Sequence, residues 1–289
     1  MPIIPDWNLD RSAMIKHFKN NDDLIDEVKR KLGGQGKFSP EIETAMRRVD
    51  RRTFIPPIFE TVEITAEEYI EQIKDIFRKM YGDDKSKIES IQLGKTVKVP
   101  AQDKAYLDEA IFIGYKQTCS QPSMVASICH YLDLSPGMRV LELGTGCGYH
   151  AAIVSEILGK KGVIVTAERI PQLAHIAQQN LKAHFGSEYD QRIIQLKGDI
   201  SLGAERLGVA SGFDRIYFAA SVSKGFDASP FVKEMSPERA IMIYPQRIND
   251  SYPGLGDNLI RRIMIDGNEI GIPEVLECVR FVPVVGKNR

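Results

Sequence analysis

The residues best suited to do chemistry form a glycine-rich loop near the middle of the chain. The stretch VLELGTGCGYHAA carries Gly144, Gly146 and Gly148 directly after an apolar run that ends at Leu143. A strand, a glycine turn and a helix in this order form a cradle for a nucleotide-like ligand. NAD, FAD, ATP and S-adenosylmethionine (AdoMet) all bind to such cradles, so the loop alone leaves the ligand open.

The glycine spacing and two acidic residues favour AdoMet. The third glycine comes one residue earlier than in the dinucleotide fingerprint, and no Lys-Ser/Thr pair follows, which excludes an ATP-binding P-loop. Glu168 lies about 20 residues after Gly148, where a carboxylate can accept from the ribose hydroxyls of NAD or AdoMet. Glu142 would repel a pyrophosphate but attract the ammonium and sulfonium groups of AdoMet.

Strand and helix patterns alternate from residue 139 onwards. RVLEL, GVIVTAE, RIIQLKGD and FDRIYFAA predict strands, and helices are expected from about Tyr149 to Leu158 and after Pro171. AIMIYP, LIRRIMID and VLECVRFVPVV predict three later strands. This order predicts an α/β fold, a Rossmann-like and mostly parallel, doubly wound sheet that binds its ligand at the carboxyl ends of the strands.

The residues before the sheet are predicted to be largely helical. One helix is expected between Met14 and Leu32, and a second begins with Ser39 as N-cap and Pro40 in the first turn. A third is expected over about 66–81, because Thr65 and Glu68 form a capping box before an apolar stripe. A short strand is expected within 96–99.

Several stretches resemble the protein-L-isoaspartate O-methyltransferase family. They include VDRRTFIP (Val49 to Pro56), AIFIGYKQTCSQPSMVA (Ala110 to Ala126), the glycine loop and the closing VRFVPVVG. The Gln-Thr-x-Ser-Gln-Pro element, Gln117 to Pro122, is specific to that family among AdoMet enzymes. The resemblance implies a class I methyltransferase that repairs damaged proteins by methylating the free α-carboxylate of L-isoaspartyl residues. The ester would then collapse to a succinimide.

The resemblance also implies the roles of individual residues. The active-site serine falls on Ser120, which would orient the acceptor, because a carboxylate is already ionised at pH 7 and needs no base. The implied cofactor contacts are Gln117, Thr118, Cys119, Glu142, Gly144, Thr145, Gly146, Gly148, Glu168, Gly198 and Asp199. The implied substrate contacts are Ser120, Gln121, Phe281, Val282 and Pro283, the last three within a strand over Arg280 to Pro283.

The sequence departs from the family pattern mainly on the acceptor side. Ile200 replaces a common glycine, the region after Ala220 is altered, and residues 57–104 form an extra segment. We therefore expect a helical part over 1–56, an inserted helix-loop segment over 57–104 and an AdoMet-binding core over 105–289. The insert is expected to pack beside the acceptor mouth, or to pair with a second subunit. Alternative functions are carboxyl methylation of another peptide or small acid, and non-catalytic AdoMet binding.

Composition narrows the remaining classes. The 289 residues carry a net charge of −1, which gives no global field for nucleic acid or an anionic membrane. Four cysteines show no metal-ligand spacing and predict reduced thiols of a cytoplasmic protein without a metal. No signal peptide is visible, and no apolar stretch approaches the roughly 18 residues of a membrane span. The partners expected are isoaspartyl proteins or peptides, and the protein would be a monomer or homodimer.

Overall fold

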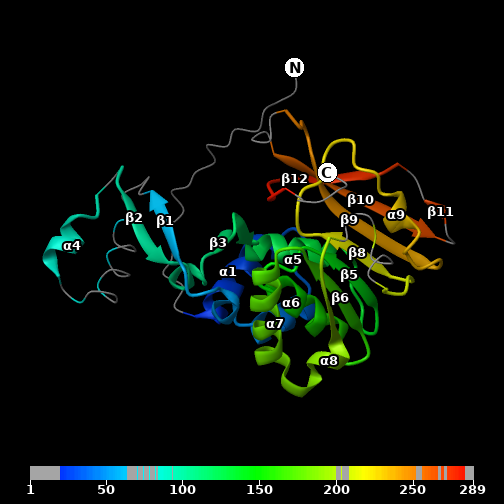
Figure 1. The fold of residues 1–289 in the computed structure, drawn as a ribbon, viewed down its shortest axis with the longest axis horizontal. Helices are drawn as coiled ribbons and strands as arrows, with labels where there is room; N and C mark the ends of the chain where they lie inside the picture. Colours follow the sequence, from blue (N-terminus) through cyan, green and yellow to red (C-terminus); the bar gives the residue numbers. More distant parts are fainter. Residues whose placement is uncertain are drawn as a thin grey trace.

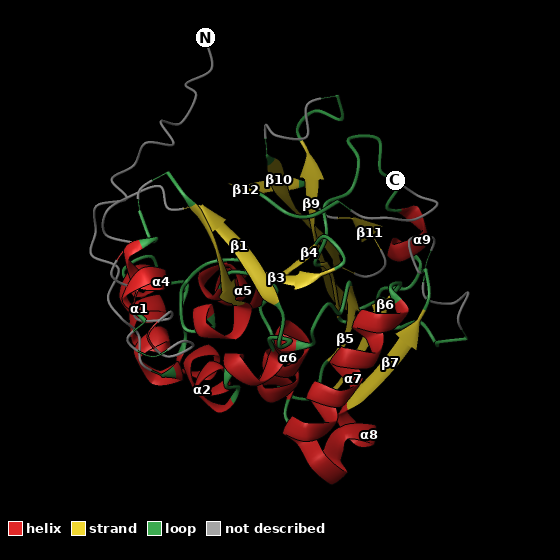
Figure 2. Cartoon of the chain, turned by 60° about the vertical axis from the view of Figure 1, so that its left-hand side comes forward, coloured by secondary structure: helices red, strands yellow, loops and turns green. Residues whose placement is uncertain are grey.

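The computed structural model describes most of the chain. The described residues are 20–63, 70, 74, 78, 82, 84–92, 94–199, 203, 208–251, 256–265, 268–269 and 272–283. They fold around one mixed sheet of eight strands, with helices packed against it (Figures 1 and 2).

The sheet has a parallel part and an antiparallel edge. Its strand order is β11-β10-β9-β8-β5-β6-β7, and β12 also pairs with β10. The parallel strands are β5 (Arg139–Leu143), β6 (Val163–Glu168), β7 (Ile193–Lys197), β8 (Arg215–Phe218) and β9 (Arg239–Arg247). The antiparallel strands are β10 (Asp257–Ile265), β11 (Asn268–Glu269) and β12 (Glu274–Val279). The predicted mostly parallel, doubly wound α/β fold is confirmed.

Five helices cover one face of the sheet. They are α1 (Asn21–Gly33), α2 (Pro40–Arg48), α5 (Pro122–Tyr131), α6 (Tyr149–Leu158) and α7 (Pro171–Phe185), and their apolar sides share a core with β5, β6 and β8. The predicted start of α2 is confirmed, since the Ser39 hydroxyl accepts from the N–H of Ile42 at 3.4 Å. The first helix begins at Asn21, capped by Asn20; Met14 to residue 19 lie outside the described residues.

The other face of the sheet packs against an aromatic cluster. Phe218 on β8 meets Phe226, Phe231 and Tyr244, with ring centroids 4.8–5.9 Å apart. Phe231 belongs to α9 (Ser229–Val232) in the chain that follows β8. The shorter elements are α8 (Tyr189–Arg192) and the 3₁₀ turns η1 (Arg51–Phe54), η2 (Ala101–Lys104) and η3 (Gly186–Glu188). None of the helices described here is long and apolar enough to cross a membrane.

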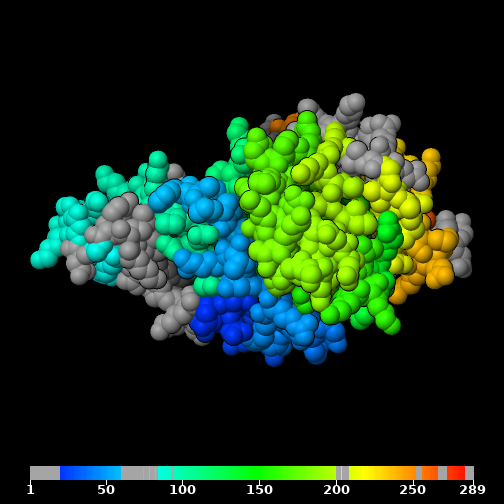
Figure 3. Space-filling view, turned by 60° about the horizontal axis from the view of Figure 1, so that its bottom comes forward, coloured from blue at the N-terminus to red at the C-terminus, as the bar shows by residue number. Residues whose placement is uncertain are grey.

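The segment predicted as an insert is held at both ends by strand pairing. β1 (Phe59–Glu63) runs antiparallel to β2 (Thr96–Pro100), so Phe59 lies opposite Pro100. The pair and α4 (Lys85–Glu89) extend from one end of the molecule (Figures 1 and 3). The expected strand at 96–99 is confirmed. Most of the expected helix over 66–81 lies outside the described residues, although Ile70, Lys74 and Arg78 are helical.

The predicted strand over Arg280 to Pro283 is wrong. β12 ends at Val279, because its partner β10 begins at Asp257, which lies opposite Val279. The chain then crosses to the loop after β8, where the Val282 carbonyl accepts from the N–H of Ser221 at 2.7 Å. The segment thus reaches the edge of the sheet where the glycine loop lies. It is held there by single contacts to the loop after β8, and strand pairing does not extend to it.

Candidate active site

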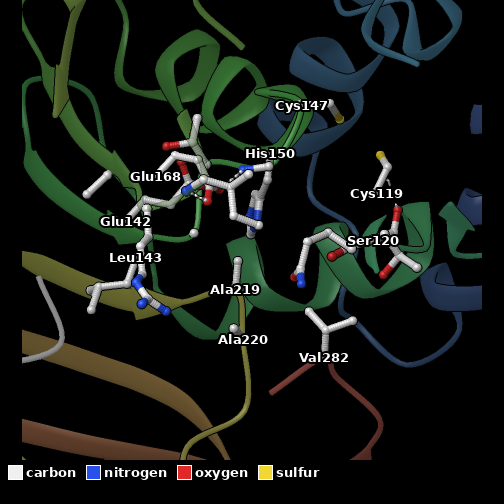
Figure 4. A pocket seen from close by; sticks show the side chains of 18 of the residues that line it. Cys119, Ser120, Glu142, Leu143, Cys147, His150, Glu168, Ala219, Ala220 and Val282 are labelled. Atoms are coloured by element: carbon white, nitrogen blue, oxygen red, sulfur yellow. Dashed lines mark hydrogen bonds between the residues drawn. The ribbon is translucent and has the colours of Figure 1, made fainter. Parts of the chain in front are cut away.

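A cavity opens at the carboxyl ends of the parallel strands. Its volume is about 980 Å³, including the part open to solvent. Its walls come from β4 (Gln117–Cys119), which pairs with β3 (Ile111–Gly114), and from the glycine loop, the ends of β6 and β7, and the C-terminal segment (Figure 4). The predicted site residues in its lining are Gln117, Thr118, Cys119, Ser120, Glu142, Gly144, Thr145, Gly146, Glu168, Gly198, Asp199, Val282 and Pro283.

Three predicted site residues lie outside the lining. Gln121 donates to the carboxylate of Asp108 at 3.2 Å, and Phe281 donates its N–H to the buried carboxylate of Asp257 at 2.8 Å. Gly148 lies behind the loop as the N-cap of α6. Each therefore fixes a wall of the cavity by what it contacts.

The backbone conformation of the glycine loop explains why glycine occupies three of its positions. Gly144, Gly146 and Gly148 have φ values of +98°, +56° and +90°, a conformation that residues with a Cβ rarely adopt. A Cβ at Gly148 would also lie 3.1 Å from Cγ of Leu181 on α7. The loop thus turns sharply while keeping its backbone open to the cavity, as a nucleoside cradle requires.

Glu168 joins the end of β6 to this loop. Its carboxylate accepts from the N–H groups of Gly146 and Ile170, both at 2.9 Å, and only 7% of the residue is exposed. Burial raises its pKa, whereas hydrogen bonds from the backbone of Ile170, Gly146 and Arg169 favour the charged form. A carboxylate has about four acceptor positions, so Glu168 keeps acceptor capacity for a ligand hydroxyl. The residues therefore fit an AdoMet ribose.

Glu142 lies deeper, at the back of the cavity. It is fully buried, and its carboxyl oxygens accept from the hydroxyls of Thr166 and Tyr217. The Thr145 hydroxyl joins this network through Thr166 at 2.6 Å. Burial raises the pKa of Glu142 to about 7. Its predicted attraction for the cationic end of AdoMet stays a prediction.

His150 packs beside the same network. It lies in the first turn of α6, and its ring centroid is 4.4 Å from that of Tyr217. Burial lowers its pKa to about 3. It is therefore a neutral side chain near neutral pH, and it packs against the Cys129 thiol at 3.7 Å.

The Glu142 pKa predicts a pH dependence of stability. Between its unperturbed value of 4.5 and about 7, folded protein retains a proton that unfolded protein releases. The stability that Glu142 contributes should therefore fall as pH rises through this window, by about 2–3 kcal/mol, and change little above it. Urea unfolding at about pH 5 and pH 8 on the wild type and Glu142→Gln isolates this contribution, since other titrating groups are common to both. Identical pH dependence in the two proteins would refute the assignment.

Arg51 is a buried anchor of the cavity wall that carries Ser120, and sequence reasoning missed it. It is 0% exposed, and its guanidinium donates to backbone carbonyls that lie 2.7–3.5 Å away. These belong to Ala105, Leu107, Glu109, Cys119 and Ser120. The half-buried Ser120 is thus fixed through its own carbonyl at 2.9 Å. The signal that could have revealed Arg51 was the VDRRTFIP stretch. It was part of the family resemblance, but no role was assigned to either of its arginines.

Asp257 anchors another part of the cavity wall, and sequence reasoning missed it as well. Its buried carboxylate accepts from the Ser221 hydroxyl at 2.5 Å and from the N–H of Phe281 at 2.8 Å. It thereby holds the segment that carries Val282 and Pro283 against the loop that follows β8. Ala219 and Ala220 of that loop also line the cavity. Nothing near Asp257 in the sequence distinguishes it from a surface aspartate.

Comparison with known proteins extends this description. The sequence profile of the PCMT family, described as protein-L-isoaspartate(D-aspartate) O-methyltransferase, matches residues 85–289. It therefore begins within the segment predicted as an insert. A protein-L-isoaspartate O-methyltransferase of Fervidobacterium nodosum is 36% identical over 210 residues, which cover 71% of this chain and 96% of the relative. Protein-L-isoaspartate O-methyltransferase 1 of Archaeoglobus fulgidus is 52% identical over 117 residues, 40% of this chain and 51% of that relative.

A solved structure shares the fold at lower identity. It is a beta-aspartate methyltransferase from Plasmodium falciparum in complex with S-adenosyl-L-homocysteine (AdoHcy), with a TM-score of 0.63 at 20% identity. The match covers 91% of this chain and 97% of that one. With the profile spanning most of the chain and a relative matched over nearly its whole length, this chain belongs to the PCMT family of AdoMet-dependent protein-L-isoaspartate(D-aspartate) O-methyltransferases.

Proposed function

We propose that this cavity is where the chain methylates the free α-carboxylate of L-isoaspartyl residues in damaged proteins. The observation that carries the proposal is that Ser120 and the Glu168–glycine loop unit line the same cavity. Bound AdoMet would supply a methyl group on a sulfonium, which is a good leaving group. The acceptor and donor sides would then face each other in one enclosed space.

The donor side is assigned to residues that the fold holds rigidly. Glu168 would accept from ribose hydroxyls, and the backbone of Gly144 to Gly146 would pass under the methionine end. Gly198 and Asp199 line the cavity after β7, where they would contact the edge of the adenine base. Gln117, Thr118 and Cys119 would cover the ligand from β4.

The acceptor side needs orientation more than acid–base chemistry. An α-carboxylate is ionised at neutral pH, so no residue has to remove a proton before attack. Holding it in line with the methyl group can supply several kcal/mol of the barrier reduction. The Ser120 hydroxyl is assigned to donate to one carboxylate oxygen, while Val282 and Pro283 would support the peptide around the isoaspartyl residue.

The test pairs an isoaspartyl peptide with its aspartyl twin. Methyl transfer from AdoMet should occur to the first alone, because the extra backbone methylene places the carboxylate differently. Ser120→Ala should lower kcat/KM about tenfold to a hundredfold, the value of one hydrogen bond to a charged group, with AdoHcy affinity little changed. The control is Ser123→Ala, three residues away on α5 and outside the cavity lining.

Each other outcome points to a different function. Equal methylation of both peptides would indicate another carboxylate acceptor. AdoHcy binding without transfer to any peptide would indicate a non-catalytic AdoMet-binding protein. Equal loss in Ser120→Ala and Ser123→Ala would mean that the serine acts through folding alone.

We also propose a role for residues 57–104 within a three-part chain of 1–56, 57–104 and 105–289. The N–H of Ala101 donates to Ile58 at 2.8 Å, and Gln102 donates to Ile55 at 2.9 Å, so the segment leaves and rejoins the body at one point. A Gly-Ser linker in place of 60–102 should therefore keep AdoHcy binding. A wider range of methylated peptides would support a role at the acceptor mouth. A dimeric mass for the wild type and a monomeric mass for the variant, measured by light scattering, would support dimerisation.

The cytosol, where thiols stay reduced, is the proposed location.

A further inference from the structure

Two cysteines face each other across the cavity. Cys119 ends β4 directly before Ser120, and Cys147 lies in the glycine loop between Gly146 and Gly148. Both line the cavity, and their side chains point toward one another (Figure 4). Each thiol shifts the pKa of the other, so the two side chains are close neighbours. The pair therefore spans two walls of the cavity. One is the acceptor wall, which carries Ser120, and the other is the cofactor wall, which the glycine loop forms.

The backbone on each side of the pair is fixed. Arg51 donates to the carbonyl oxygens of Cys119 and Ser120, and the Asn180 amide donates to the carbonyl of Cys147 at 2.9 Å. The same Asn180 amide donates to Phe54 at 3.1 Å, which ties the glycine loop to η1. The facing arrangement is thus a built feature of two anchored loops.

The two thiols differ in their chemistry. The pKa of Cys119 is lowered, first by its hydrogen bond with Cys147 and further by the positive charge of Arg51. The pKa of Cys147 is raised by the same hydrogen bond and by burial. A thiolate beside a thiol is the arrangement of an attacking and a resolving cysteine. Both residues are buried, at 4% and 2% exposed, so the cavity that they line is the route by which a molecule as small as peroxide would reach them.

We propose that Cys119 and Cys147 form a reversible disulfide under peroxide, and that this cross-link switches off the cavity. The Cys119 thiolate attacks one peroxide oxygen, the O–O bond breaks, and the leaving hydroxide is protonated to water. The Cys147 sulfur then attacks the sulfenic Cys119 sulfur, the S–O bond breaks, and the hydroxide leaves as water with the Cys147 proton. Two thiols are oxidised to one disulfide, and one peroxide is reduced to two waters.

The cross-link should disturb both halves of the site. Bonded sulfurs are about 2 Å apart, closer than any non-bonded contact, so the two loops must be drawn together. A displacement of about 1 Å in reacting groups can cost a hundredfold in rate. The cofactor wall also moves, so AdoHcy binding should weaken. The effect on methyl transfer rests on the proposed function, whereas the cross-link and AdoHcy affinity do not.

The experiment treats the reduced full-length protein with hydrogen peroxide. Peptide mapping without reductant should join the Cys119 and Cys147 peptides as the main product. AdoHcy affinity and methyl transfer to an isoaspartyl peptide should each fall at least tenfold and recover with dithiothreitol. AdoHcy at about 100 times its Kd should slow cross-linking at least tenfold, since it fills the cavity.

Matched variants separate the pair from the other thiols. Cys278 is exposed, and Cys278→Ala should cross-link like the wild type. In Cys147→Ala, or Cys147→Ser if that variant folds poorly, dimedone should trap a sulfenic acid on Cys119 and no cross-link should form. A map without the 119–147 link, or a link that leaves AdoHcy affinity unchanged, overturns the proposal. If the protein forms the cross-link under peroxide but its reduced form methylates no isoaspartyl peptide, the proposed function is refuted instead.

Discussion

Replacing Arg51 by methionine is expected to lower the free energy of unfolding by about 3–5 kcal/mol. The guanidinium is fully buried and serves the carbonyls of five residues, from Ala105 to Ser120. Methionine fills similar volume but donates nothing, so these buried acceptors lose a charged partner. The guanidinium also lies over the ring of Tyr149, 5.6 Å from its centroid, and this contact would be lost. Urea unfolding monitored by circular dichroism measures the change.

The neighbouring arginine provides the control. Arg52 lies on the same 3₁₀ turn, but its side chain is 49% exposed and pairs with Asp103 at 3.1 Å. An exposed ion pair contributes roughly 0–1 kcal/mol, so Arg52→Met should stay within that range. Arg51→Lys should fall between the two, because one ammonium cannot reach all five carbonyls. Similar losses in Arg51→Met and Arg52→Met would contradict the anchoring role.

Arg51 also shows why the acceptor wall could not be built from sequence. Its partners lie 54–69 positions away, and five backbone carbonyls carry no side-chain signature. The same holds for Asp257, whose partners Ser221 and Phe281 come from two separate segments. Strand periodicity likewise extended the last strand past Val279, although its partner β10 begins opposite that residue. Long-range pairing decided these features.

The cofactor wall was predictable because its constraints are local. Left-handed backbone at Gly144, Gly146 and Gly148 demands glycine, so the loop is visible as a motif. Strand and helix periods placed α6 at Tyr149–Leu158 and put Glu168 at the end of β6. Sequence did not predict that Glu168 accepts from the loop itself, through the N–H of Gly146. That contact makes Glu168 a support of the loop in addition to its proposed role as acceptor for the ribose hydroxyls.

Glu168→Ala is accordingly expected to weaken AdoHcy binding by at least tenfold. Loss of charge-assisted acceptors for two ribose hydroxyls removes about 1.5–3 kcal/mol each, or about 3–6 kcal/mol before the loop relaxes. The N–H groups of Gly146 and Ile170 lose their acceptor as well, so the free loop should become less ordered. Titration calorimetry with AdoHcy measures the affinity, and hydrogen exchange at Gly146 reports the loop.

Two further variants decide whether the carboxylate itself is responsible. Glu168→Gln keeps one acceptor but turns an NH₂ group toward a backbone N–H, so its affinity should lie between those of the alanine variant and the wild type. Glu188→Ala removes a partly exposed glutamate that pairs with Lys160 and Arg192 and lies outside the cavity lining, so it should leave AdoHcy affinity unchanged. At about pH 8, where Glu142 is ionised, the wild type should bind AdoHcy more tightly than NAD, because a pyrophosphate would approach this buried carboxylate. Equal AdoHcy affinity in Glu168→Ala and the wild type would remove Glu168 from the site.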